Sequence, residues 1–435
     1  MKRGILYILL SCLIHQTYSQ TLAVQRCTAF EKGMNISNWL EAAWQPNWPT
    51  ANGYSKADLQ KMKDAGIKSL RLPICFARVS DSIAPYAVDT NHILFSRIDS
   101  VIQWADELQM NVIIDNHHEW SFTNERWRVN RERFAHLWAV VADKYKYLDP
   151  NRYTFELLNE PPLFFALDSL NIVLNDAIDS IRHQTATHSI IVSPNASSLG
   201  IAFRTSYTPL PDTNLIYTWH CYDPVDFTHQ GFTWTNPVFP TGTPFPIIPT
   251  SFYESVLYEG ITRLNHWRDT FNRPVFLGEF GVGEFADDAS RCNWMEYMGH
   301  QLDSTHTSWF YWDWRWDFSL FNSHVVSADS VIPCFAHALH LYGDTVFSSV
   351  KQEQSLELFN VNIYPTIICT RSTFHISTEG LSNFNCKIFD STGRLVQQQN
   401  FTQSEVNVTF PFERGIYFVQ LMAANKKVVK KLVVD

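Results

Sequence analysis

Between about Arg26 and Asp344 the sequence alternates short apolar segments with stretches whose apolar residues recur at helical spacing. Apolar residues every three or four positions line one face of a helix, whereas short runs of β-branched and aromatic residues form buried strands. This alternation predicts eight strands, at residues 33–36, 69–72, 112–114, 153–158, 189–192, 215–219, 275–277 and 308–312. Strands that alternate with helices build a parallel sheet covered by those helices.

Eight strands with intervening helices over about 320 residues have the size of an α/β (β/α)8 barrel, the TIM barrel. One predicted helix has both ends marked, because Ser55 and Asp58 have the spacing of a capping box and Gly66 provides a stop. A doubly wound open sheet is the alternative fold. It is disfavoured because no glycine-rich phosphate turn follows the first strand.

The pattern changes after Asp344. From Leu358 onward, short alternating segments separated by turn residues predict a small all-β sandwich. The predicted organisation is therefore a signal peptide at residues 1–19, a barrel at 20–345, a linker at 346–357 and a β-sandwich at 358–435.

The first 19 residues resemble a secretory signal. Lys2 and Arg3 precede an apolar stretch, and small polar residues lead to a plausible cleavage position at Ser19. No later run of 18 or more apolar residues is present, so we expect no transmembrane segment. Seven cysteines follow the signal without a CxxC pair, and although export permits disulfides, the sequence does not give their pairing.

The charge of the chain disfavours one class of partner. A formal net charge of -9, with no basic run in the bulk of the chain, argues against nucleic-acid binding, which needs a concentrated cationic patch. Neutral substrates fit better. The 15 tryptophans are compatible with sugars, since the flat apolar face of Trp is a surface on which sugar rings stack.

Two carboxylates stand at the ends of apolar runs. Glu160 follows Leu157-Leu158-Asn159, and Glu279 follows Val275-Phe276-Leu277-Gly278. In a parallel barrel both would reach the mouth at the C-terminal ends of the strands. Carboxyl groups about 5 Å apart can cleave a glycosidic bond by double displacement, and we expect this pair to meet in one groove.

The surroundings of the two carboxylates suggest their roles. Glu160 follows a very apolar strand, which favours a protonated acid/base, and the Asn159 amide can donate to a sugar 2-hydroxyl. Glu279 is the predicted nucleophile. Arg71 can hold it ionised by charge pairing, and we interpret the flanking glycines as space for an approaching ligand.

Histidines form a second group of candidate residues. His117, His118 and His220, with Tyr222, follow or end predicted strands, and we expect them to bind sugar hydroxyls or the nucleophile. A zinc site made by the three histidines with Glu119 is the alternative. It is weak because the helical HExxH spacing is missing, so no metal or other cofactor is expected.

Aromatic side chains complete the candidate site. Trp312 and Trp314 would point the same way on an extended strand, so one of them can form a sugar platform, while Trp309 is expected in the core. Further candidates in predicted loops are Trp44, Trp48, Trp120 and Trp234. Asp115, Glu156 and Asp313 are alternative carboxylates, whose expected role is structural.

Taken together, seven ordered segments resemble glycoside hydrolase family 5, the retaining β-glycanases that include many cellulases. They are residues 33–38, 70–73, 115–118, 158–161, 220–222, 278–281 and 311–313. The resemblance places the acid/base at Glu160 and the nucleophile at Glu279. It implies supporting roles for Arg71, His117, Asn159, His220 and Tyr222, and for His118 as a second histidine found in some members.

Residues 227–231 with Trp234 further resemble the endoglucanase branch of this family, in which that Trp lines the cleft. Cys221 departs from the bulky residue often found between the histidine and the tyrosine. The tail from about Leu358 resembles the C-terminal sorting domain of the type IX secretion system, with short motifs near residues 361–365, 388–394 and 415–419. This implies passage through the periplasm, then release or attachment to the cell surface.

The sequence therefore predicts a secreted retaining endo-β-1,4-glucanase that acts as a monomer on β-glucan and is exported by the type IX machinery. Alternative substrates by the same mechanism are β-mannan, xyloglucan and mixed-linkage glucan. An alternative of another class is a non-catalytic carbohydrate-binding surface protein. It is disfavoured because both Glu160 and Glu279 are present with their polar neighbours.

Overall fold

A computed structural model describes two stretches of the chain, residues 21–342 and 361–434. The first has gaps at 120–121, 123–125, 163–164, 196–202, 204–206, 246–250 and 322–330, and the second at 365–366, 369–372, 379–382, 391–394, 410–414 and 424–425. The predicted signal peptide, the linker at 346–357, Trp120 and the motif residues 391–394 lie outside the described residues. The chain divides into two compact units at about residues 343–344. The exact domain boundaries stay a prediction.

Eight parallel strands form a closed barrel in sequence order, with β8 pairing back onto β1. The predicted fold is thus confirmed. The strands are β1 (Lys32–Asn35), β2 (Ser69–Ile74), β3 (Asn111–Asn116), β4 (Tyr153–Glu156), β5 (Ile190–Val192), β6 (Leu215–Cys221), β7 (Val275–Phe280) and β8 (Trp309–Tyr311). Their bounds differ from the predicted ones by a few residues: β7 continues to Phe280, whereas β4 ends at Glu156.

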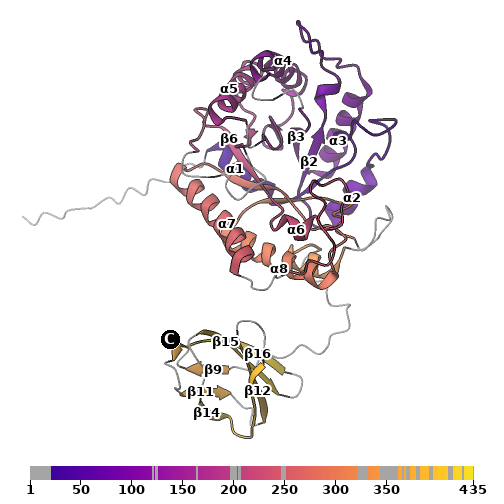
Figure 1. Cartoon of the computed structure of the whole chain (residues 1–435). Helices are drawn as coiled ribbons and strands as arrows, with labels where there is room; N and C mark the ends of the chain where they lie inside the picture. The colour runs from indigo at the N-terminus through magenta and orange to yellow at the C-terminus, as the bar shows by residue number, and fades with distance from the viewer. Residues whose placement is uncertain are drawn as a thin grey trace, which may run out of the picture. The chain divides into compact units, whose positions relative to one another are not determined.

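Helices surround the barrel (Figure 1). The longer ones are α2 (Lys56–Asp64), α3 (Ile93–Leu108), α4 (Trp127–Tyr145), α5 (Leu167–Gln184), α7 (Ser251–Phe271) and α8 (Asp288–Thr305). Short helical turns are η1 (Phe76–Arg78), α6 (Val225–Thr228) and α9 (Pro333–Ala338). A disulfide between Cys292 and Cys334 joins α8 to α9. The sequence alone had not indicated which cysteines pair.

Helix α2 begins as its sequence predicts. The Ser55 side chain accepts from the Asp58 backbone N–H, and the Asp58 side chain accepts from the Ser55 backbone N–H at 2.7 Å. Gly66, just past the end of the helix, has φ of +97°, a conformation that favours glycine. Local sequence alone therefore determines both ends of this element.

Helix α1 (Leu22–Phe30) was not predicted as an element. Its inner residues pack with side chains from the barrel in one buried cluster, made of Ala23, Cys27, Phe30, Ile113, Ile191, Ile216, Phe276 and Phe310. Arg26 donates to the carbonyl of Arg152 and to Asn111, which lie at the N-terminal ends of β4 and β3. The helix therefore closes the barrel at the end opposite to the strand C-termini.

The second unit consists of strands β9 (Val361–Tyr364), β10 (Ile367–Ile368), β11 (Thr373–Thr378), β12 (Phe384–Asp390), β13 (Leu395–Phe401), β14 (Glu405–Thr409), β15 (Gly415–Ala423) and β16 (Lys426–Val434). They form a five-stranded sheet in the order β10-β16-β15-β12-β13 and a three-stranded sheet in the order β14-β11-β9. Phe374 and Val408 from the smaller sheet share a buried core with Ile388 and Val419 from the larger. This unit is the predicted small β-sandwich.

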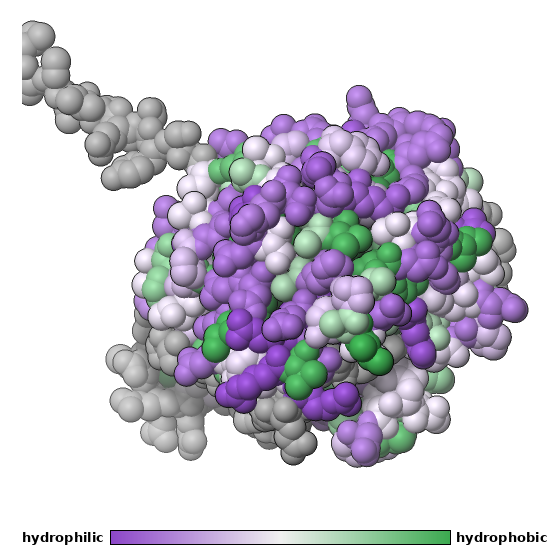
Figure 2. Space-filling view, turned by 90° about the horizontal axis from the view of Figure 1, so that it is seen from above, coloured by the Kyte–Doolittle hydropathy of each residue, from purple (hydrophilic) through white to green (hydrophobic). Residues whose placement is uncertain are grey.

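Among the helices of the described residues, none combines the length and the apolar character needed to cross a membrane. Figure 2 shows the face that lies at the top of Figure 1. On this face apolar residues form separate patches within a largely hydrophilic surface.

Candidate active site

The predicted site residues gather at one end of the barrel because their strands are parallel. Arg71 lies within β2, and its long side chain reaches the carboxyl pair. The others lie at or just after the C-terminal end of a strand: His117 and His118 after β3, Asn159 and Glu160 after β4, His220 and Tyr222 at the end of β6, Glu279 in β7, and Trp312 after β8. The closed order of the strands brings these ends together around one mouth.

The two candidate carboxyl groups face one another across this mouth. Nδ1 of His220 lies 2.7 Å from Glu160 Oε1 and 3.6 Å from Glu279 Oε2. A carboxylate oxygen of each glutamate and a ring nitrogen of His220 all lie within 4.8 Å of one another. The side chain of Glu279 is 6% exposed, whereas that of Glu160 is 34% exposed.

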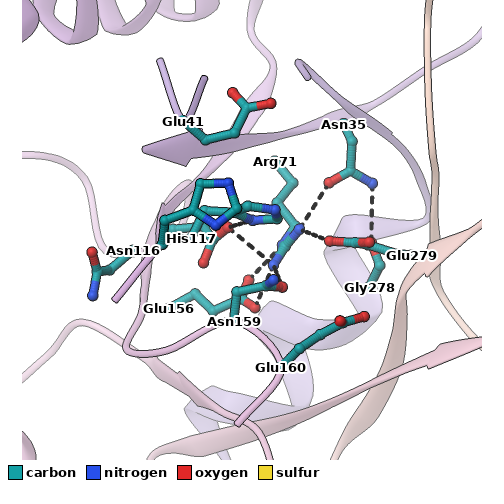
Figure 3. Close-up of polar contacts among 12 residues, drawn as sticks. Asn35, Glu41, Arg71, Asn116, His117, Glu156, Asn159, Glu160, Gly278 and Glu279 are labelled. Atoms are coloured by element: carbon teal, nitrogen blue, oxygen red, sulfur yellow. Dashed lines mark hydrogen bonds and ion pairs between the residues drawn. The ribbon is translucent and has the colours of Figure 1, made fainter. Parts of the chain in front are cut away.

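Glu279 is held by one cation and one hydroxyl. Arg71 Nη1 donates to its Oε1 at 2.6 Å (Figure 3). The Tyr222 hydroxyl donates to its Oε2 at 2.9 Å. The pKa of Glu279 is raised above its ordinary value, because burial outweighs the lowering effects of its neighbours. The contacts with Arg71 and Tyr222 oppose this rise and favour the ionised form, which is the form that a nucleophile requires.

Arg71 is the centre of a buried polar network (Figure 3). It makes two hydrogen bonds to Glu156, of 2.7 and 2.8 Å, and an ion pair of 3.0 Å with Asp115. Burial by itself lowers the pKa of Arg71, but the facing carboxylates of Asp115, Glu156 and Glu279 raise it well above its ordinary value. The guanidinium is therefore charged and fixed in direction, with no exposed surface.

Asn159 is oriented by the same guanidinium. Its Oδ1 accepts from Arg71 Nη2 at 2.8 Å. Because Arg71 binds the oxygen of the amide, the NH2 group is left to donate a hydrogen bond elsewhere. A sugar hydroxyl is a suitable acceptor.

Glu160 lies in a different environment from Glu279. Burial raises its pKa to about 7, against the lowering influence of Arg71. Its neighbour His220 is neutral near pH 7, because burial lowers the pKa of that imidazole to about 4. The backbone at Glu160 has φ of +38°, which for a residue other than glycine costs about 1–3 kcal/mol. The fold therefore holds at the mouth a carboxyl group that can keep a proton.

The histidines after β3 are neutral groups on one wall of the site. Nδ1 of His117 lies 2.7 Å from Asp115 Oδ2, and its ring stacks on Trp312 with centroids 5.4 Å apart. The His118 ring packs against Trp44 at 5.3 Å. Burial lowers the pKa of both imidazoles, that of His118 to about 3.

Glu160 and Glu279 line a cleft of about 640 Å³, together with His117, His118 and Tyr222. Arg71, Asn159 and His220 lie outside its lining and act on it through their contacts with the two glutamates and with one another. Trp44 and Trp234, at separate parts of its rim, are 60% and 59% exposed. Trp312 also lines the cleft, whereas Trp314 and Trp309 are buried, so Trp312 is the member of the pair that is available to a sugar. Trp48 is outside the lining and packs on His92.

The interpretation of the glycines beside Glu279 was wrong. A Cβ on Gly278 would lie 2.3 Å from Thr218 Oγ1 and 2.9 Å from His220 Nε2. A Cβ on Gly281 would lie 2.2 Å from the carbonyl oxygen of Trp312. Both glycines therefore make room for neighbouring parts of the protein rather than for a ligand.

Sequence reasoning assigned no role to several lining residues: Asn38, Glu41, Val225, His229, Asp317 and Phe318. Of these, Asn38 and His229 lie in the segments 33–38 and 227–231 that carry the family resemblance. Glu41 is buried and accepts backbone N–H groups from Asn38 and Trp39, and burial raises its pKa to about 8. Asn35, at the end of β1, was also given no role, and its side chain accepts a hydrogen bond of 3.0 Å from Arg71. The lining residues follow β1, β6 and β8 in the chain. This position could have indicated them, since loops at the C-terminal face form the site of a barrel.

A metal site is poorly matched to these residues. Within the described parts of the chain, three residues that could act as metal ligands lie close together: Glu160, His220 and Glu279. The Arg71 guanidinium contacts Glu279 directly, and its positive charge opposes a bound cation. The alternative zinc set is not assembled, because Glu119 pairs with Arg133 and His117 with Asp115.

Comparison with known families agrees with this geometry. The family model described as cellulase (glycosyl hydrolase family 5) matches residues 27–317, which include Glu160, Glu279 and every site residue predicted from the sequence. The chain belongs to glycosyl hydrolase family 5. Its C-terminal unit matches a second model, the secretion system C-terminal sorting domain, over residues 362–435. The family 5 barrel is thus followed by a sorting domain, which indicates secretion or attachment to the cell surface.

Curated relatives of this family 5 chain include endoglucanases. Endoglucanase 3 of Fibrobacter succinogenes is 28% identical over 349 residues, which cover 70% of this chain and 52% of that protein. Cellodextrinase A of Ruminococcus flavefaciens is 24% identical over 280 residues, covering 61% of this chain and 80% of that protein. The chain thus spans about half the length of the first of these relatives.

Solved structures of similar fold include Thermotoga maritima Cel5A. Its structure in complex with cellobiose matches with a TM-score of 0.66 and 27% identity, covering 73% of this chain and 99% of that one. The same protein in complex with mannotriose matches with a TM-score of 0.65 and 26% identity, at the same coverage. The family 5 barrel described here therefore corresponds to nearly the whole of that protein.

Proposed function

We propose that the chain is a secreted retaining endo-β-1,4-glucanase with Glu279 as nucleophile and Glu160 as acid/base. The observation that carries this proposal is the approach of the two carboxyl groups, with oxygens within 4.8 Å of one another in one cleft. Retaining enzymes have carboxyl groups about 5–5.5 Å apart, whereas inverting enzymes leave about 6.5–9.5 Å for a water molecule.

The first step breaks the glycosidic bond. A Glu279 carboxylate oxygen attacks C1 of the sugar, while Glu160 gives its proton to the departing glycosidic oxygen. The product is a glycosyl ester on Glu279 and a released sugar chain with a free hydroxyl. Glu160 suits the donor role because its pKa is raised to about 7.

The second step releases the sugar. Glu160, now ionised, takes a proton from water as the water oxygen attacks C1, and the Glu279 carboxylate leaves. Arg71 and Tyr222 contact Glu279 and stabilise the charge that returns to it. Two inversions at C1 give net retention, and Glu160 regains the proton that it donated.

An endo mode of action is supported by the form of the cleft. The half-exposed Trp44 and Trp234 lie on different parts of the rim, against His118 and His229 respectively. Sugar rings of one chain can stack on both, so a polymer can cross the site. We propose Arg71, His117, His118, Asn159, His220, Tyr222, Trp234 and Trp312 as residues that bind the substrate or support its binding.

Replacing the nucleophile is the direct test. Glu279→Gln and Glu279→Ala should abolish hydrolysis of β-glucan while the protein stays folded and still binds the polymer. Glu107→Gln is the matched control, because Glu107 is a half-exposed carboxylate on α3, away from the site. A correctly folded Glu279 variant with near-normal activity would contradict the assignment. So would an initial product of inverted anomeric configuration, observed by NMR.

β-Mannan is the second candidate substrate for the same mechanism. It is supported by the structural match to Thermotoga maritima Cel5A, which was crystallised with both cellobiose and mannotriose. Reducing-sugar release from cellulose derivatives, β-mannan, xyloglucan and mixed-linkage glucan separates the candidates. Hydrolysis of any of them excludes a purely carbohydrate-binding role.

A further inference from the structure

Phe285 is an exposed aromatic residue on the same face of the barrel as the carboxyl pair. It lies in the loop between β7 and α8, just after the C-terminal end of β7, and is 47% exposed. It is outside the lining of the cleft. A single exposed aromatic is common on protein surfaces, so its meaning depends on how it is held and what lies beside it.

The ring of Phe285 is held in position by close packing. It meets the Phe232 ring edge-on, with centroids 5.0 Å apart. It also lies directly over Gly231, where a Cβ would come within 2.7 Å of the ring and 2.8 Å of Thr241. Gly231 has φ of +80°. Only glycine readily combines this backbone angle with such close contact. Gly231 therefore allows the Phe285 ring to pack directly on the backbone, which fixes its position.

Phe285 is joined to the cleft by a continuous series of ring contacts. Phe232 stacks on Trp234 at 5.3 Å on the rim and on Phe318 at 5.4 Å in the cleft. Phe318 in turn contacts the Tyr222 ring at 5.7 Å, and the Tyr222 hydroxyl donates to Glu279. Phe232 and Phe318 are themselves buried, so they form a packed aromatic support that links Tyr222, beside the proposed nucleophile, to the exposed rings of Trp234 and Phe285.

The two loops that carry these rings are fixed to one another. Trp234 Nε1 lies 3.3 Å from Asp317 Oδ2, and the Glu284 N–H donates to the Asp317 carbonyl at 3.1 Å. The buried Gln230 side chain makes hydrogen bonds to both the beginning and the end of the Trp234 loop, at Phe227, Gly242 and Thr243. Trp234 and Phe285 are thus ordered before any ligand binds, which lowers the entropic cost of binding.

From this arrangement we infer that Phe285 forms a distal sugar-binding subsite, beyond Trp234, that takes up the continuation of a β-glycan chain. The inference rests on the proposed function and extends it to substrate length. Trp234 and Phe285 are exposed and both pack on the buried Phe232. Flat, uncharged rings of this kind suit the apolar faces of neutral sugar rings. The subsite contacts only chains long enough to reach past Trp234, so it favours polymers and long oligosaccharides over short ones.

The test compares Phe285→Ala with wild type on a series of β-1,4-linked oligosaccharides of increasing length, with kcat/KM as the measurement. We expect unchanged kcat/KM on the shortest hydrolysed oligosaccharides and a loss of roughly three- to tenfold on the longest, the size of one aromatic contact. Phe285→Trp should restore the value for long substrates. The matched control is Tyr147→Ala, because Tyr147 is 72% exposed but lies between α4 and β4, at the opposite end of the barrel.

A second readout separates binding from turnover. Calorimetry with Glu279→Gln and with Glu279→Gln/Phe285→Ala should show weaker binding of long oligosaccharides to the double variant and equal binding of short ones. Equal loss on all lengths, or none on any, overturns the subsite while leaving the proposed function in place. Failure of the wild type to hydrolyse any β-glycan overturns the proposed function and the subsite with it.

Discussion

At the residue scale, the two carboxyl groups of the cleft differ in what surrounds them. Glu279 receives hydrogen bonds from a guanidinium and a phenol, whereas Glu160 faces a neutral imidazole and is partly exposed. Opposed environments of this kind separate the pKa values of an acid and a nucleophile. The assignment of roles thus depends on neighbours that are distant in sequence.

The raised pKa of Glu160 predicts the alkaline limb of the pH profile. Because this pKa is about 7, Glu160 keeps its catalytic proton below about pH 7 and loses it above. The wild-type kcat/KM should therefore fall as the pH rises beyond neutrality, and at low pH it should fall again when Glu279 becomes protonated. Glu160→Gln should lack the alkaline limb. Persistence of that limb in the variant would assign it to another group.

The leaving group provides a separate test of Glu160. Removal of a general acid typically costs about 10²–10⁴-fold in rate. Glu160→Ala should lose activity of this order on β-glucan, but much less in the first step on a dinitrophenyl glycoside, whose leaving group departs without a proton. Burst kinetics would show the accumulating glycosyl-enzyme. Equal losses on both substrates would contradict the acid role.

Replacing Arg71 should lower the stability of the protein by an amount that depends on pH. Arg71→Met leaves Asp115, Glu156 and Glu279 without their buried cation, which should lower the free energy of unfolding by about 3–5 kcal/mol at neutral pH. Protonation of these carboxyl groups removes the uncompensated charges, so the loss should shrink at acidic pH. Urea unfolding at both pH values measures it. An equal loss at both would show that lost packing, not charge, is responsible.

At the element scale, the site is a property of strand ends. Parallel strands place every C-terminal end at the same rim, so the position of a polar residue directly after an apolar run is enough to predict that it faces the mouth. The same rule explains why Glu41 and Asp317 were missed. They follow strands too, but lie farther along irregular loops, where periodicity gives no direction.

The disulfide between α8 and α9 should stabilise the folded barrel. Cys292 and Cys334 are 42 residues apart, and closing a loop of this size restricts the unfolded chain by an amount worth about 2–4 kcal/mol. Cys292→Ser/Cys334→Ser should lower the melting temperature, and a reducing agent should lower that of the wild type but not of the variant. Identical melting of both proteins under oxidising conditions would show that the link is not stabilising.

At the scale of the whole molecule, the site and the sorting domain belong to separate units. All proposed catalytic and binding residues lie before residue 343, and the sandwich has a buried core of its own. Removal of residues 346–435 should therefore leave kcat/KM on β-glucan unchanged while abolishing export. Activity assays on the purified truncated chain and immunoblots of cell fractions measure the two effects. A large loss of activity would show that the barrel depends on the second unit.

The sequence by itself determined the barrel, the sandwich and the pair of glutamates, because strand and helix periods, capping residues and strand-end carboxylates are local patterns. Only the tertiary structure decided that helix α1 closes the barrel, that Gly278 and Gly281 serve packing, and which cysteines of the barrel pair. It also decided the distance between the two carboxyl groups. Such facts depend on closure of the sheet, which brings together residues that no local pattern relates.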